Sequence, residues 1–303
     1  MPNKQSIPKP AIGLHLADGT MWSFESEDEE GIAIISQLAK AMKFKPLHGP
    51  AHRLHVAIDR GNGCPSGAWE LAGRKAFTSP PSGHEPRSTA IPRHFHVNNQ
   101  AVCTFKPSAN GEMFNVQMMR LSLVLCQYAQ IRGGLLLHGA LAEHNGNGVL
   151  LVGPGGGGKT TASLRLPPHW RSLSDDSALV VCKNQQEYRA HPWPTWSTFM
   201  FGGRGGSWDV EENVRLRAII FLEPADDDRL DPVNETEAVG GLINAAEEAH
   251  REMSCFTSKE VIRALRLQRF DNICELLKAV PCYHLYISLT GSFWDDIETE
   301  ILY

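Results

Sequence analysis

Hydrophobic and polar positions in the first part of the chain alternate in ways that predict a small α/β region. Residues 11–24 (AIGLHLADGTMWSF) read as two short strands joined at Asp18-Gly19, a dipeptide typical of tight hairpins. An amphipathic helix follows, for which Ser26 is the predicted N-cap, with acidic residues in the first turn. The run RLHVAID (53–59) alternates like a further strand.

A loop and a long apolar helix separate this region from the rest. Residues 60–90 are dense in Gly, Pro and Ser and predict a loop. A strand-like run at 95–105 leads into a long apolar helix at 113–131. We place a boundary near residue 108, which divides the chain into an N-terminal α/β region (1–108) and a second domain (109–303).

The second domain mixes buried strands with amphipathic helices. Its predicted strands are 149–152, 177–182, 216–224 and 282–289, and its predicted helices are 161–166, 235–250 and 258–280. The stretch 191–208 (HPWPTWSTFMFGGRGGSW) shows little regular pattern. The expected fold class is therefore mixed α/β, with sheets flanked by helices.

Composition excludes several classes of function. Hydrophobic residues make up 42% and charged residues 21% of the 303, as in ordinary globular proteins. A net charge of −5 argues against general nucleic-acid binding, and no apolar run is long enough to span a membrane. Seven cysteines without a CxxC, and a start without an apolar signal region, favour reduced thiols and a cytoplasmic location.

A glycine-rich loop carries the strongest chemical signal. The run GPGGGGKT, from Gly153 to Thr160, satisfies the P-loop pattern G-x-x-x-x-G-K-[ST] between a predicted strand and a predicted helix. Backbone N–H groups in such a loop cradle phosphate oxygens, assisted by the start of the helix. Lys159 is expected to reach the β- and γ-phosphates of ATP, and the Thr160 hydroxyl to bind Mg²⁺. The predicted nucleotide-binding residues are Gly153, Gly155, Gly156, Gly157, Gly158, Lys159, Thr160 and Thr161.

Residues on both sides of this loop point to phosphoryl transfer. His138 precedes Gly153 by fifteen positions, and the pair Asp175-Asp176 follows Lys159. Adjacent carboxylates on a turn can divide two tasks, one binding the metal and the other accepting the proton of the attacking hydroxyl. Asp also favours turns and N-caps, and a histidine at a strand end is often a core residue, so these structural roles stay open.

The order of His-Gly, P-loop and Asp-Asp over residues 131–224 resembles the HPr kinase group, relatives of the ATP-dependent phosphoenolpyruvate carboxykinases. The resemblance implies an HPr kinase/PEPCK-like core of mixed sheets. It also implies Asp175 as the catalytic base and Asp176 as a metal ligand in contact with His138, although the two roles could be exchanged. Thr161 stands where HPr kinases usually carry Glu, and their glycine-rich C-terminal signature is not apparent. Reverse phosphorylase activity and a bacterial carrier protein as substrate are therefore not implied.

The similarity extends to shorter HPr-kinase-like proteins encoded beside peptide-modification genes. These include lasso-peptide tailoring kinases, which phosphorylate a serine of a precursor peptide. The stretch GLHLADGTMWSFESEDEEG (13–31) is also similar to the SynChlorMet cassette ScmC type. The implied function is an ATP- and Mg²⁺-dependent kinase whose partner is a peptide or protein with an acceptor serine.

Three alternatives remain at this point. The apolar strand AIIFLE ends at Glu223, and such an acid serves the metal in ordinary P-loop NTPases, which would make the protein a generic ATPase or switch. A non-catalytic nucleotide-binding partner in a peptide-maturation assembly would use the same loop without transferring phosphate. A small-molecule kinase would differ only in its acceptor.

Several smaller features carry weaker expectations. Arg204, flanked by two glycine pairs, could act as an arginine finger or lie in a flexible exposed turn. Trp193, Trp196 and Trp208 could form an apolar wall for a ligand or pack a proline-rich loop onto the core. The acids at 226–228 are expected to form a solvated turn.

The remaining histidines and the N-terminal region give little more. His94 and His96 would share one strand face, and His48, His52 and His55 are close in sequence, but no complete metal-ligand set is apparent. The N-terminal region has no chemical motif. Peptide recognition, self-association into a homo-oligomer and support of the second domain all remain open for it.

Overall fold

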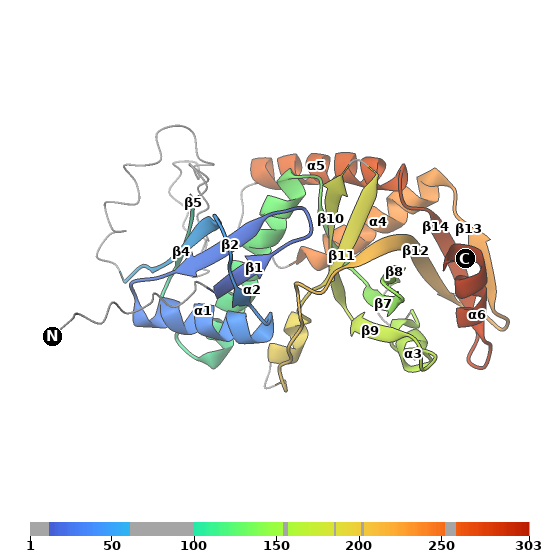
Figure 1. Cartoon of the computed structure of the whole chain (residues 1–303), viewed down its shortest axis with the longest axis horizontal. Helices are drawn as coiled ribbons and strands as arrows, with labels where there is room; N and C mark the ends of the chain where they lie inside the picture. The colour runs from blue at the N-terminus through green and yellow to red at the C-terminus, as the bar shows by residue number, and fades with distance from the viewer. Residues whose placement is uncertain are drawn as a thin grey trace.

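The structure is a computed structural model, and it describes residues 12–60, 100–153, 157–184, 186–200, 203–251 and 259–302. The described part of the chain has the expected mixed α/β architecture, with two sheets and six α-helices. Figure 1 shows the two sheets side by side, with α2 (Gly111–Ile131) close to both and with α4 (Glu235–Ala249) and α5 (Lys259–Leu277) along the larger one. No helix in the described ranges is long and apolar enough to cross a membrane.

The smaller sheet is built from the N-terminal part of the chain. Its strands run in the order β3-β1-β2-β4-β5, and the predicted hairpin of β1 and β2 is confirmed, with Gly19 at φ +85° in its turn. Two helices, α1 and α2, accompany this sheet. The bounds are β1 Ile12–His15, β2 Met21–Glu25, α1 Glu29–Ala41, β3 Lys45–Pro46, β4 His52–Ile58, β5 Gln100–Phe105 and α2 Gly111–Ile131.

The predicted N-cap of the first helix was wrong. The N-cap of α1 is Asp28, whose carboxylate accepts the backbone N–H of Glu30 at 2.9 Å. Ser26 instead donates its hydroxyl to the carbonyl oxygen of Val56 in β4, at 2.6 Å. The serine therefore ties the helix entry to the sheet, and the helix begins two residues later than expected.

The larger sheet holds nine strands in the described part of the chain. Its main path is β6-β10-β11-β12-β8-β7-β9, and β14 joins β12 and carries β13. The long central strand β12 pairs in parallel with β8 and β14 and antiparallel with β11. The bounds are β6 Leu135–His138, β7 Ala140–His144, β8 Asn147–Val152, β9 Arg171–Ser174, β10 Ser177–Asn184, β11 Glu187–Pro192, β12 Val214–Pro224, β13 Arg229–Pro232 and β14 Cys282–Ile287.

Helices cover this sheet and close the chain. In the second domain, the sequence pattern missed β6, β7, β9, β11, β13 and α6, which are short or lie in segments with a mixed pattern. The remaining elements are α3 Lys159–Leu164, the 3₁₀-helix η2 Trp196–Phe199, α4 Glu235–Ala249, α5 Lys259–Leu277, α6 Phe293–Ile297 and the π-helical turn η4 Glu298–Leu302.

One hydrophobic core joins the two sheets. It combines side chains of α1, α2 and the smaller sheet with Leu136, Leu179 and Val181 of the larger sheet. Trp193 is fully buried in this core. The other two tryptophans of the 191–208 stretch pack against it as partly buried residues. Of the two roles open for these tryptophans, the structure therefore shows packing onto the core.

The acidic turn at 226–228 is not uniformly solvated, which corrects the expectation for Asp228. Its two carboxylate oxygens accept the backbone N–H groups of Ser288 and Phe293, at 2.6 and 3.1 Å. The Arg165 side chain donates to the carbonyl oxygens of Ser288 and Gly291 in the same loop. Asp228 is therefore an anchor for the segment between β14 and α6, whereas Asp226 and Asp227 are exposed.

A buried histidine connects the two sheets by hydrogen bonds. His191 in β11 accepts the backbone N–H of Ala17 at Nε2 (3.1 Å), so its Nδ1–H donates to the carbonyl oxygen of Val210 (2.6 Å). Both bonds require the neutral ring, because a protonated Nε2 could not accept from Ala17. Burial lowers the pKa of His191 to about 4.

This pKa predicts a loss of stability in mild acid. The unfolded chain binds a proton at His191 near pH 6.5, whereas the folded chain does not until about pH 4. The free energy of unfolding should therefore fall as the pH decreases through this window, by about 2 kcal/mol at pH 5 from this residue. Urea unfolding of the wild type and of His191→Gln between pH 7.5 and 5 tests this, with exposed His48→Gln as control. An equal pH dependence in the His191 variant would show that the residue is not responsible.

Candidate functional site

The glycine-rich loop connects a central strand to a helix, as its sequence context predicted. It follows β8, which ends at Val152, and it leads into α3, which begins at Lys159. Gly158 adopts φ +96°, a left-handed conformation that favours glycine. The helix has only six residues and ends at Leu164, two residues before the expected end, so a helix dipole contributes little here.

Some of the predicted loop residues lie outside the described residues. These are Gly155 and Gly156, and the side chain of Thr160 is likewise outside the description. Gly153, Gly157 and Thr161 are partly or fully buried beside Lys159. The geometry of the site is therefore built from Lys159 and the groups that approach it.

Lys159 is buried at the start of α3, with 8% of its surface exposed. Its ammonium group donates to the carbonyl oxygen of Gly153 at the other end of the loop. Burial lowers the pKa of Lys159, and the negative charges of Glu248 and Asp176 oppose this effect. Lys159 and these two carboxylates form a local charge cluster. The cluster connects the glycine-rich loop to the turn that carries Asp176 and to α4, which carries Glu248.

Strand pairing brings His138 to the aspartate pair. His138, the last residue of β6, is the register partner of Ser177, the first residue of β10. The next residue, Gly139, donates its backbone N–H to the carbonyl oxygen of Asp176 at 2.9 Å. This pairing places His138 Nδ1 3.4 Å from Asp176 Oδ1.

The two aspartates of the pair point to different partners. Asp176 is close to His138 and within electrostatic range of Lys159. Asp175 is exposed, and its Oδ1 accepts the hydroxyl of Thr195 at 2.7 Å. In the turn between β9 and β10, the Asp176 carboxylate therefore faces the lysine. The Asp175 carboxylate faces solvent, and the Thr195 hydroxyl holds one of its oxygens.

Glu248 is a site residue that the sequence did not indicate. It lies near the C-terminal end of α4, and its Oε2 is 3.8 Å from His138 Nε2, while its Oε1 is 3.7 Å from Arg251. His138 thus has a carboxylate on each side of its ring. No local pattern points to Glu248, because it occupies an ordinary polar position of an amphipathic helix.

Burial and neighbouring charges set the protonation of Asp176. Burial raises the pKa of Asp176, His138 and Lys159 lower it, and Asp175 and Glu248 raise it. The carboxyl group therefore holds its proton at a higher pH than an exposed aspartate. Cations drawn into this site would favour its ionised form.

Arg204 and Glu223, the two remaining residues that the sequence suggested for the site, lie outside the charge cluster around Lys159. Arg204 is exposed in a loop whose Gly205 N–H donates to the carbonyl oxygen of Thr198, and in the described residues its side chain forms no ion pair. Glu223 is exposed at the end of β12, two residues beyond Phe221, the register partner of Val152 in β8. Glu223 is therefore at the same end of the parallel strands as the glycine-rich loop.

Metal ligation by histidine was not expected from the sequence. The described part of the chain contains no group of three or more His, Cys, Asp or Glu side chains arranged to hold a metal ion. His52 contacts the Tyr128 hydroxyl at 3.0 Å, and His55 is 3.9 Å from Glu25. His94 and His96 lie outside the described residues.

The fold and the loop define a mixed α/β protein with a strand, a glycine-rich loop and a helix at the centre of its larger sheet. The family described as SynChlorMet cassette protein ScmC matches residues 101–303, and the chain belongs to this family. The matched range contains the whole larger sheet and the site, whereas residues 13–31, which carried the sequence resemblance to this family, lie outside it. A comparison with curated proteins finds no match.

The charge cluster predicts opposite effects of two substitutions on Asp176. Glu248→Gln removes a negative neighbour and should lower the pKa of Asp176, whereas His138→Gln removes a stabilising partner of the carboxylate and should raise it. Titration of ¹³C-labelled aspartate carboxyl groups by NMR in the nucleotide-free protein measures both shifts. Shifts of the same sign in the two variants would contradict the arrangement.

Proposed function

We propose that this protein is an ATP- and Mg²⁺-dependent kinase that transfers the γ-phosphate to a hydroxyl group, the serine of a peptide or protein. The observation that carries the proposal is the convergence of the buried Lys159 with the partly buried Asp176 and His138 at the carboxyl end of β8. A lysine that belongs to a P-loop sequence and has an adjacent carboxylate pair matches the requirements of phosphoryl transfer. This arrangement also supports the HPr kinase/PEPCK-like resemblance.

The residues present fit a nucleotide with its metal ion. Lys159 supplies a positive charge for phosphate oxygens, and the left-handed Gly158 allows the tight backbone turn that brings N–H groups together. Asp176 supplies a carboxylate oxygen and, with the Thr160 hydroxyl of the motif, an oxygen donor set of the kind Mg²⁺ prefers. Bound ATP would supply the phosphoryl group, and its Mg²⁺ ion would neutralise negative charge on the phosphate oxygens.

The chain's own residues would then hold the acceptor and move its proton. Asp175 is exposed, and Thr195 fixes one of its oxygens, so its other oxygen can accept the proton of an incoming hydroxyl. His138 would orient Asp176 from one side, and Glu248 would hold His138 from the other. Arg204 would act only if its glycine-flanked loop closed over the site.

A second candidate function rests on the position of Glu223. β12 is the parallel neighbour of β8, and its carboxyl end lies beside the glycine-rich loop. An acid at this position serves the metal in ordinary P-loop NTPases, which would make the protein an ATPase or switch. A nucleotide-binding partner without transfer activity and a small-molecule kinase remain as further alternatives.

Nucleotide binding should depend on Lys159. Lys159→Ala removes a charged donor to phosphate and should weaken the affinity for Mg²⁺–ATP by about tenfold to a hundredfold, since such hydrogen bonds contribute about 1.5–3 kcal/mol. Calorimetric titration measures the change, and exposed Lys106→Ala is the matched control. Equal affinity of the wild type and the Lys159 variant would remove the basis of the proposal.

Phosphate transfer should depend on Asp175 and not on Glu223. Asp175→Asn removes the proposed base and should slow transfer by at least about a hundredfold while nucleotide affinity changes little. The assay incubates the protein with γ-labelled ATP, Mg²⁺ and the peptides encoded beside its gene, and detects a gain of one phosphate by intact mass. Full transfer by Asp175→Asn would exclude Asp175 as the base. ATP hydrolysis without transfer to any peptide, lost in Glu223→Gln, would favour the second candidate. Nucleotide binding with no gain of phosphate on any peptide would favour the non-catalytic alternative.

A further inference from the structure

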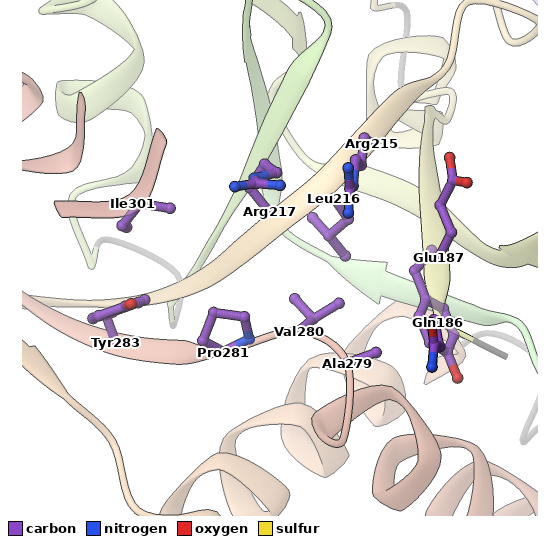
Figure 2. Close-up of a pocket in the computed structure, with 11 residues that line it drawn as sticks. Gln186, Glu187, Arg215, Leu216, Arg217, Ala279, Val280, Pro281, Tyr283 and Ile301 are labelled. Carbon is purple, nitrogen blue, oxygen red and sulfur yellow. The ribbon is translucent and has the colours of Figure 1, made fainter. Parts of the chain in front are cut away.

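A hollow lies where the central strand of the larger sheet changes its neighbour. On one side, β12 pairs with β11 up to Arg215 and with β14 only from Ile219 onward. The space between the two neighbours is a hollow of about 220 Å³, lined by the start of β11, by Arg215–Arg217 of β12 and by residues 279–283 before and within β14 (Figure 2). The fork in the sheet thus creates a concave surface.

Two arginines without ion pairs line this hollow. Within the described residues, the guanidinium groups of Arg215 and Arg217 form no hydrogen bond and no ion pair. Figure 2 shows both side chains on β12, with Leu216 between them. The acidic lining residue, Glu187, is already paired with Arg189 at 2.7 Å and with Lys183 at 3.5 Å. The hollow therefore has positive charge that no lining carboxylate neutralises.

The pairing of β11 with β12 makes the position of Arg215 energetically unfavourable. Arg215 is the register partner of Arg189 across the antiparallel pair, and like charges at opposing positions destabilise a sheet. The register of β12 with β8 shifts between Leu216 and Ala218, so Arg217 is the extra residue of a β-bulge. Alternate residues of a strand project to the same face, and Arg215 and Arg217 both line the hollow.

The exposed lining of the hollow is more polar than apolar. Leu216 and Val280 are buried beneath it, and the exposed Pro281 and the partly buried ring of Tyr283 continue the surface beside them. An arginine pair recognises the paired oxygens of carboxylate or phosphate. We propose that this hollow binds a small molecule or side group that carries an oxyanion.

This site is separate from the one at the glycine-rich loop. Arg217 and Glu223 stand six positions apart on β12, which corresponds to about 20 Å along a strand. The hollow is at the amino end of the parallel strands, and Lys159 is beyond their carboxyl end. Binding at the hollow therefore does not depend on the proposed kinase activity.

The test uses phenyl phosphate and benzoate as probes of the two oxyanions. Each is titrated into the full chain in the Lys159→Ala background, which removes the charge of the glycine-rich loop, and binding is followed by NMR. We expect binding of at least one probe in this background and at least a tenfold increase in Kd when Arg217→Gln is added. Benzyl alcohol, which lacks the oxyanion, should not bind.

A matched control separates the site from general charge effects. Arg53→Gln removes an exposed arginine of the smaller sheet and should leave both affinities unchanged. Thermal unfolding of the Arg217 variant should match that of its parent, since no ion pair is lost. Absence of binding by both probes, or an unchanged Kd in the Arg217→Gln variant, would overturn the proposal.

Discussion

The antiparallel register between β6 and β10 is the constraint on which the candidate site depends. It aligns His138 with Ser177 and lets Gly139 donate its N–H to the carbonyl oxygen of Asp176. A shift by one residue would send each side chain to the opposite face of the sheet. The imidazole and the carboxylate would then separate, although every residue of the motif would still be present.

Burying charged groups at this site costs free energy unless groups of opposite charge lie close together. Lys159 is buried and Asp176 is partly buried, and burial alone disfavours the charged form of each. Each offsets part of this cost for the other, with His138 as a further partner of the carboxylate. Glu248 adds negative charge near Lys159 and Asp176, so the site has an excess of acid that a divalent cation would balance.

The long strand β12 gives the larger sheet two distinct ends. At its carboxyl end it lies in parallel with β8, beside the glycine-rich loop and Glu223. At its amino end, the exchange of β11 for β14 leaves a hollow beside Arg217. One strand thus connects the proposed nucleotide site and the proposed oxyanion site, about 20 Å apart by strand geometry.

The sequence by itself determined most of the regular elements and the position of the glycine-rich loop between a strand and a helix. Period-two and helical patterns are local, so β1, β12 and α2 could be located from spacing alone, and the run Gly153–Thr160 predicts a phosphate ligand from its motif. The N-cap of α1 was misplaced because Ser26 is held by Val56, a residue distant in sequence. Such a contact leaves no local signal.

Only the tertiary structure decided which distant groups meet. Glu248 contacts His138 because α4 packs against β6, and Thr195 holds Asp175 because the chain returns past the β9–β10 turn. The arginine hollow arises from a change of strand partner, which no spacing along the chain encodes. The periodic pattern of a segment reflects contacts between residues that are close in sequence. The contacts at the site are set by packing between distant segments, where burial and charge are balanced over the whole fold.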